Sequence, residues 1–320
     1  MSEKNIYLTY KQYLKGWKDY TVIHKIFVWK HHVIPFADGI VRGGVNNQFS
    51  LDEHDDVLRV ATTSNNPRTN NVFCLDYHLN IIGKIENIAP RESIYSARYV
   101  NTRLYMVTFR QIDPFYVVNL TDHRNPEILG ELKITGFSRY LHPYDETTII
   151  GLGRQATNTG RQLGLKISLF DVTDVKNPVE SASFELEERY ASSTAEWEHK
   201  AFLMSRSKNL LVIPGRYWLG DVKFNGAFVF YIDKEKIVLR DIVDHMINKN
   251  DNFFQRNVER SLYIENYLYT KSKCLLRINS IEDLKGLKNV EICSNRKFRN
   301  SSPIVPTVPA PDLILRSNRA

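Results

Sequence analysis

Histidines lie near carboxylates at two places in this sequence, and such pairs can serve as general acids and bases. His142 precedes Asp145 by three residues in LHPYDE, and EWEHK brings Glu196, Glu198 and His199 together. If either imidazole met a carboxylate in an open cavity, the pair could activate water or withdraw a proton. A hydrolase or lyase that uses such a pair is therefore one of two functions that the sequence allows.

The other familiar motifs for catalysis and for metal binding are missing from the sequence. The nine histidines do not show the H-E-x-x-H spacing that places two zinc ligands on one face of a helix. No G-x-S-x-G nucleophile turn occurs. The glycines of GLGRQATNTGR, which begins at Gly151, are not followed by the Lys-Ser or Lys-Thr pair of a phosphate-binding loop, so we interpret this stretch as a long loop between strands. We expect neither a metal ion nor a cofactor.

A second group of polar residues suggests a site for binding rather than for catalysis. It combines the phrases FRQIDP and YLHPYDE with the histidine of EWEHK, and its members are Arg110, Asp113, His142, Tyr144, Asp145 and His199. Each phrase borders a predicted strand, so the fold decides whether these side chains meet. The alternative is that Arg110 and Asp113 pair with each other and brace neighbouring strands, because polar groups near a packed core usually satisfy one another.

The elements that would position these residues are indicated by a repeated phrase. VVNLTDHRNPEI at 117–128 and LFDVTDVKNPVE at 169–180 share a hydrophobic run followed by Thr-Asp, two variable residues and Asn-Pro, 52 residues apart. The aspartate carboxylate can accept amides of its own turn, and proline keeps the residue before it out of the helical region. We therefore expect a strand that ends in the same turn in both copies, formed by Asp122, Asn125 and Pro126 in the first and by Asp174, Asn177 and Pro178 in the second.

Looser copies of this phrase recur along the chain, each preceded by two short β-rich runs joined by a polar turn. The polar residues that end the copies are 43 to 62 residues apart and are Asp76, Asn119, Asp171, Asp233 and Asn279. Two such runs indicate a hairpin, so each unit holds about four strands, the content of one propeller blade. Because the blade-connecting loops on one face of a propeller converge on the central channel, we expect the polar residues of the second group there.

We therefore predict an all-β protein, a β-propeller of about five four-stranded blades and a partial one. Residues 1–292 would form the propeller, with blade units near 5–30, 48–88, 93–134, 138–186, 198–244 and 259–292, and residues 293–320 would form a Pro-rich disordered tail. This count predicts an incomplete ring. An open ring leaves the flanks of the first and last units without neighbours, which favours self-association through these edges.

The run that extends from IYSARYVNTRLYMVTF through GLKISLFDVTDVKNP to HKAFLMSRSKNLLVIP resembles the C-terminal β-propeller domain family of archaeal and bacterial secreted proteins, which is distantly related to WD-type repeats. The matching phrases extend from residue 5 to residue 292. The resemblance implies the fold. Members of the family are largely uncharacterised, so it supplies no catalytic residues, and it implies an exported or cell-surface protein.

The N-terminal sequence does not show the features expected of an exported or cell-surface protein. MSEKNIYLTYKQY lacks the charged start and apolar core of a signal peptide, and no apolar run reaches the ~20 residues that span a bilayer. By these features alone the chain would stay in the cytoplasm, and its localisation is left open. Of the three cysteines, Cys74 is expected to be a small buried hydrophobe, whereas Cys274 and Cys293 could pair but are expected to be unpaired because the count is odd.

The charge balance bears on the partners. The formal net charge is +7, with basic residues spread along the chain. A positive surface attracts polyanions, so we expect an unknown protein or a polyanionic ligand, whereas no helix-turn-helix, zinc-finger or RNP pattern supports nucleic acid. The main hypothesis is a binding or scaffolding propeller module without catalytic activity of its own, and the hydrolase or lyase is the alternative.

Overall fold

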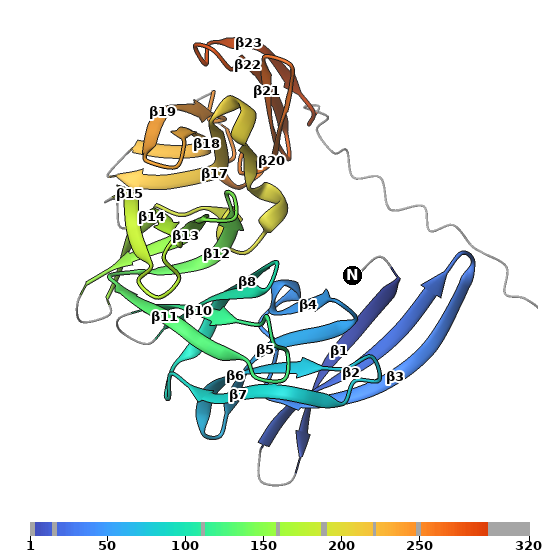
Figure 1. Cartoon of the computed structure of the whole chain (residues 1–320). Helices are drawn as coiled ribbons and strands as arrows, with labels where there is room; N and C mark the ends of the chain where they lie inside the picture. Colours follow the sequence, from blue (N-terminus) through green and yellow to red (C-terminus); the bar gives the residue numbers. More distant parts are fainter. Residues whose placement is uncertain are drawn as a thin grey trace, which may run out of the picture.

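The computed structural model describes residues 4–14, 18–109, 113–157, 161–186, 191–219, 222–247 and 251–293. Within these ranges the chain forms antiparallel strands in six sheets, together with five short 3-10 helices (Figure 1). Of the predicted tail, residues 293–320, only Cys293 lies within them, and residues 294–320 lie outside. Within the described ranges no helix has the length and apolar character needed to cross a lipid bilayer.

The sheets follow one another in chain order. The first contains three strands, β1 (Asn5–Leu14), β2 (Lys18–Trp29) and β3 (His32–Arg42). The second contains β4 (Leu51–His54), β5 (Val57–Asn65), β6 (Arg68–Leu75) and β7 (Ile81–Ile88), and the third contains β8 (Ser93–Val100), β9 (Arg103–Phe109), β10 (Asp113–Asn119) and β11 (Glu127–Ile134).

The remaining three sheets also have four strands each. The fourth contains β12 (Phe137–Pro143), β13 (Thr148–Ala156), β14 (Gln162–Asp171) and β15 (Val179–Leu186). The fifth contains β16 (Leu203–Ser205), β17 (Leu210–Leu219), β18 (Val222–Ile232) and β19 (Ile237–Asp244), and the sixth β20 (Val258–Ile264), β21 (Tyr267–Ser272), β22 (Leu275–Ser280) and β23 (Gly286–Glu291). The 3-10 helices are η1 (Gln48–Ser50), η2 (Thr194–Glu196), η3 (His199–Ala201), η4 (Arg206–Lys208) and η5 (Phe253–Gln255).

The six sheets form the blades of a propeller whose ring is open. In every sheet the strands pair in chain order as a meander. Figure 1 shows the sheets arranged along an arc, with the first strands of the four-stranded sheets toward its middle, the fourth strands toward its outside, and the first and last sheets at its two ends. The predicted fold, five four-stranded blades and a partial one in an incomplete ring, is therefore confirmed.

The hydrophobic core is divided among the joints between neighbouring sheets. Leu104 of β9 packs in the cluster shared with the second sheet, whereas the next residue, Tyr105, packs in the cluster shared with the fourth. Both side chains are fully buried. Middle strands therefore bury both faces, which explains why their sequences are almost continuously apolar although the sheets are antiparallel. Each joint holds one sheet on the next, and this fixes the positions of the inner strands.

The first blade is larger than the sequence predicts. The sequence predicts a partial unit near 5–30, but the first sheet extends to Arg42 and includes β3. In the other sheets the chain passes from the fourth strand into the first strand of the next sheet, and β3 leads into β4 in the same way. Thus β1 corresponds to a second strand, and within the described ranges no strand pairs with its inner edge.

The predicted loop at 151–161 is wrong for residues 151–156, which belong to β13, and residues 158–160 lie outside the described residues. A Cβ on Gly153 would lie 1.9 Å from the carbonyl oxygen of Phe137 on β12. Gly153 therefore allows the paired strands β12 and β13 to approach closely, and it is not part of a loop.

The expectation of unpaired thiols also fails for two of the three cysteines. Cys274 and Cys293 form a disulfide across the last sheet. The odd count misled the prediction because Cys74, which is buried as expected, is the free cysteine. The fold brings the ends of this segment together, since Ile292 donates its backbone amide to the carbonyl of Cys274 at 2.8 Å.

The repeated turns occupy equivalent places, as predicted, because β10 and β14 are each the third strand of a four-stranded sheet. The Asp122 carboxylate accepts the amide of Arg124 at 2.9 Å, and Asp174 accepts the amide of Lys176 at 3.0 Å. Each carboxylate also accepts a hydrogen bond from the asparagine side chain three residues on, at 2.7 Å in the first turn and 2.8 Å in the second. The same chemistry therefore closes both turns.

Each repeated turn packs against a glycine in the outer strand of the preceding sheet. A Cβ on Gly83 of β7 would lie 2.1 Å from the carbonyl oxygen of His123, and one on Gly130 of β11 would lie 2.5 Å from that of Val175. Only glycine fits such an approach. Turn and glycine together form a repeated joint between blades.

Candidate functional site

Two short segments on the inner side of the arc build the candidate site. The first contains η1, for which Asn47 is the N-cap and accepts the amide of Phe49 at 2.9 Å. The second contains η2 and η3 and follows the fourth sheet. Gln48 of the first segment lies 3.2 Å from Nδ1 of His199 in the second, so the two segments meet although they are 151 residues apart.

A buried ion pair fixes the second segment. The Glu196 carboxylate, whose side chain is inaccessible to solvent, accepts hydrogen bonds from Arg154 at 3.0 and 3.1 Å and from the backbone amide of Ser193 at 3.2 Å. Arg139 approaches the same carboxylate at 3.5 Å. Removing one partner of such a buried ion pair leaves the other charge buried without a counter-charge. The backbone around η2 is therefore held in one position.

Three cavities adjoin one another along these segments, and together we call them the central groove. Cavity 1, of about 380 Å³, lies between β1 and β4 and reaches η1. Cavity 2, of about 410 Å³, lies between η1, the inner strands β8 and β12, and η2. Cavity 3, of about 500 Å³, lies between η2 and β20. Asn47 lines the first and second cavities and Trp197 lines the second and third, so each cavity adjoins the next.

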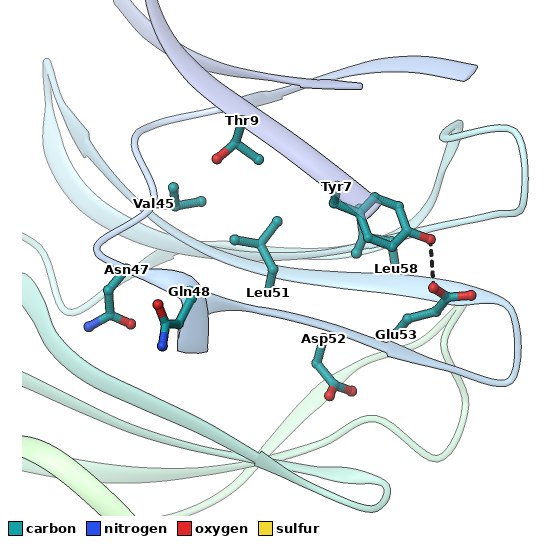
Figure 2. Close-up of a pocket in the computed structure, with 9 residues that line it drawn as sticks. All are labelled: Tyr7, Thr9, Val45, Asn47, Gln48, Leu51, Asp52, Glu53 and Leu58. Carbon is teal, nitrogen blue, oxygen red and sulfur yellow. Dashed lines mark hydrogen bonds between the residues drawn. The ribbon is translucent and has the colours of Figure 1, made fainter. Parts of the chain in front are cut away.

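Cavity 1 is shown in Figure 2. The Tyr7 hydroxyl donates to Glu53 at 2.9 Å, and Asn5 donates to the same carboxylate at 2.8 Å. Burial, followed by the hydrogen bond to Glu53, raises the pKa of Tyr7 far above its ordinary value. The Asp52 carboxylate pairs with Arg59. The polar wall of this cavity is therefore an ordered hydrogen-bonded surface.

Trp197 stands between cavities 2 and 3 and is 60% exposed. Its backbone amide donates to the carbonyl of Thr194 at 3.2 Å, and that of Glu198 donates to the same oxygen at 2.9 Å. Because Glu196 holds η2 in place, the backbone from which the exposed indole projects is fixed. An exposed aromatic ring that projects from a fixed backbone between two cavities is typical of a binding surface.

His142 does not form an acid-base pair. Its Nδ1 lies 3.2 Å from the Tyr140 hydroxyl, and its ring packs against Phe202 with centroids 4.9 Å apart. Burial, followed by the charge of Arg98, lowers its pKa to about 4. The imidazole is therefore neutral near pH 7. Within the described ranges no carboxylate lies within hydrogen-bonding distance of it.

His199 lies in the same aromatic cluster without a carboxylate partner among the described residues. Its ring meets that of Phe49 edge to face at 5.1 Å, and Phe49 in turn lies 5.8 Å from Tyr140. The two predicted histidines therefore border one cluster of rings beside the groove. Their surroundings favour packing over proton transfer.

Two of the other predicted site residues contact side chains of the fifth blade. Tyr144 is buried with Arg206 over its ring, and Asp145 pairs with Lys234 at 2.5 Å, so both serve the joint between the fourth and fifth sheets. Asp113 begins β10. Arg110 lies outside the described residues, so the predicted pairing of Arg110 with Asp113 stays a prediction.

The sequence analysis missed the residues that contribute most to the groove. Trp197 belongs to the EWEHK phrase, and the signal that could have identified it is a lone tryptophan between two glutamates. Arg139 and Arg154 gave no signal, because their partner Glu196 lies tens of residues away. The described residues contain no group of three or more His, Cys, Asp or Glu side chains placed to hold a metal ion.

Comparisons with known proteins give one family model and two uncharacterised relatives. A family model described as a β-propeller domain matches residues 1–284. An uncharacterised protein of Methanocaldococcus jannaschii is 34% identical over 296 residues, which are 90% of this chain and 43% of the relative. One of Archaeoglobus fulgidus is 34% identical over 276 residues, 84% of this chain and 40% of the relative. The chain thus spans less than half the length of these curated relatives.

Among solved structures, the β-propeller domain of the Trilobed protease from Pyrococcus furiosus, described as having an open velcro topology, is similar to this chain. The TM-score is 0.47 at 10% sequence identity, and the match covers 92% of this chain and 82% of the other.

Proposed function

Because the chain belongs to the β-propeller domain family, we propose that it is a binding or scaffolding module whose ligand-binding surface is the central groove. The observation that carries this proposal is the row of three adjoining cavities with the exposed indole of Trp197 between two of them. Each cavity has a volume in the range of known ligand sites, ~300–1,000 Å³.

The rigidity of the groove supports binding. η1 is closed by a capping box at Asn47, and η2 by one at Ser193. A surface that is already ordered loses little conformational entropy when a ligand arrives. The groove is therefore arranged before binding.

The alternative, a hydrolase or lyase, rests on His142 or His199, and among the described residues neither of these two rings has a carboxylate within hydrogen-bonding distance. It needs an imidazole within reach of a carboxylate in an open concavity. His142 contacts a phenol and His199 contacts an amide. The surroundings of both rings therefore favour binding over catalysis.

We further infer that the two ends of the arc contribute to scaffolding through self-association. Leu8 and Tyr10 on the first sheet and Leu262 and Ile264 on the last are 49–56% exposed. A second copy of the chain offers apolar faces of the same kind, so two copies can cover these residues.

The test compares two exposed tryptophans. The full chain, Trp197→Ala and Trp29→Ala are each exposed to neutral polysaccharides, a peptide library and nucleic acids, and bound ligand is quantified. Trp29 is 58% exposed on β2, away from the groove, and is therefore a matched control. We expect at least one class to bind the wild type and Trp29→Ala but not Trp197→Ala. The proposal is overturned if no class binds in a Trp197-dependent manner.

A further inference from the structure

Most of the charged groups that line the groove pair with an opposite charge, whereas Glu53 in cavity 1 accepts hydrogen bonds from Tyr7 and Asn5. Glu196 pairs with Arg154 at 3.0 Å, and Asp52 pairs with Arg59. In cavity 3, Glu259 accepts from Lys271 at 2.6 Å, and Glu198 lies 3.6 Å from Arg260, which also lines this cavity. Five carboxylates and two arginines line the three cavities, so the charge balance of the lining is negative.

This balance disfavours a polyanion in the groove, although the net charge of the chain is +7. Binding of a nucleic acid or a sulfated polymer is driven by unpaired Lys and Arg side chains that release counterions. The groove offers carboxylates in all three cavities, and they would repel phosphate or sulfate groups. A neutral ligand avoids this repulsion.

The inner strand edges are not free for an added peptide strand beside cavity 2. Asn46 donates its side-chain amide to the carbonyl of Tyr95 on β8 at 2.9 Å. The Ser96 hydroxyl donates to the carbonyl of Ser138 on β12 at 2.7 Å, and Arg98 donates to that of Leu141 at 2.8 Å. Extended peptides bind by pairing their backbone with such edges. Since side chains occupy these carbonyls, strand addition is disfavoured here.

The remaining features match one class of polymer. A sugar ring has an apolar face of C–H groups and an edge of hydroxyls that both donate and accept. The open indole of Trp197 supplies a flat apolar surface for such a face. Amides and carboxylates on both sides, such as Asn47 and Asn257, supply mixed donors and acceptors for hydroxyls.

From these observations we infer that the central groove binds a neutral glycan chain, with one sugar ring on Trp197 and neighbouring rings in cavities 2 and 3, and with cavity 1 as an extension. This inference rests on the proposed function and specifies its ligand class. The continuity of the three cavities through Asn47 and Trp197 predicts that several linked sugars bind better than one.

The experiment measures the affinity of the full chain for malto-, cello- and manno-oligosaccharides of two to six units by calorimetry or affinity electrophoresis. We expect at least one series to bind, with affinity rising at least tenfold from two to six units. Trp197→Ala should lose at least tenfold and Trp29→Ala less than twofold. Affinity should not fall when sodium chloride rises from 50 to 500 mM, because no counterions are released.

The outcomes separate this inference from the proposed function. If a peptide or a nucleic acid binds through Trp197 and no oligosaccharide does, the glycan inference is wrong and the binding function stands. If an oligosaccharide binds equally well to Trp197→Ala, the groove is not its site and the inference fails. If none of the classes binds through Trp197, both are wrong. Melting curves of the two variants confirm that each is folded, which is expected since both side chains are exposed.

Discussion

At the scale of single residues, the joints between blades contain buried polar groups that are satisfied by long-range partners. His245, which is fully buried, lies between two hydroxyls, 3.0 Å from Ser272 and 2.8 Å from Thr270. A neutral imidazole has one donor and one acceptor, and two hydroxyls satisfy both. Burial, followed by the charges of Arg277 and Arg256, lowers the pKa of His245 to about 3.

This environment predicts that acid destabilises the fold. The unfolded chain takes up a proton at His245 near pH ~6.5, whereas the folded chain does so only near pH 3. The unfolded state therefore binds more protons between these values, and the free energy of unfolding should fall as the pH drops from 6.5 toward 3. The free energy of unfolding, measured by urea denaturation at several pH values, should depend less steeply on pH for His245→Gln than for the wild type.

The control for this prediction is His31→Gln, because His31 is exposed in the turn between β2 and β3. In this variant the free energy of unfolding should depend on pH as it does in the wild type. An equally steep dependence in His245→Gln would mean that other groups, such as His142, cause the acid sensitivity.

A second residue-scale prediction concerns Glu196. Replacement by alanine leaves Arg154 without its buried partner, so we expect a loss of about 3–5 kcal/mol in the free energy of unfolding. The matched control is Glu86→Ala, since Glu86 pairs with Lys84 at 2.6 Å on the surface, where such pairs contribute about 0–1 kcal/mol. Equal losses in the two variants, measured by chemical denaturation, would contradict the role assigned to the buried pair.

At the scale of elements, the strand, its terminal turn and the glycine of the preceding blade act as one unit. The turn places the carbonyls of 123–124 and 175–176 against the outer strands that contain Gly83 and Gly130. The turn therefore closes its own blade and at the same time sets the distance to the neighbour.

Replacement of either glycine should be costly. Gly83→Ala and Gly130→Ala introduce a Cβ within 2.5 Å of a backbone oxygen, so we expect a loss of about 1–3 kcal/mol in unfolding free energy. The control is Gly286→Ala in β23, where the nearest atom is the flexible end of Arg277 at 3.1 Å. A loss in the control as large as in the other two would show that the effect arises from strand propensity and not from the joint.

The turn aspartates give a milder prediction at the same scale. Asp122→Ala and Asp174→Ala each remove the acceptor for a backbone amide. We expect a measurable fall in melting temperature, smaller than that of Glu196→Ala because the turns are exposed. An unchanged melting temperature in both variants would remove the proposed role of these carboxylates.

At the scale of the whole molecule, the open ring exposes sheet faces that a closed ring would cover. The exposed apolar residues of the first and last sheets include Leu8, Tyr10, Ile40, Leu262, Ile264 and Tyr267. The two sheets lie at opposite ends of the arc in Figure 1. Exposed apolar faces of this kind favour association.

We therefore expect the purified chain to associate as its concentration rises. Sedimentation velocity should show an average mass that increases with concentration, and the double variant Leu8→Lys, Tyr10→Lys should shift the transition to higher concentration. A compact monomer at every concentration would contradict this prediction. Leu8 and Tyr10 are not among the residues that line the three cavities, so this double variant tests association and Trp197→Ala tests the groove.

The repeated architecture could be predicted from local sequence patterns. The Thr-Asp-x-x-Asn-Pro phrase, the hairpin signals and their spacing gave five four-stranded blades, a partial one and an open ring, because turns and strand periodicity depend on residues close together in the chain. The candidate site depends on contacts that form only in the folded chain. These contacts pair Asp145 with Lys234 and Cys274 with Cys293, and they bring Arg154 to Glu196 beside the exposed Trp197. Such contacts join residues tens of positions apart, so local pattern does not encode their partners, and packing between blades selects them.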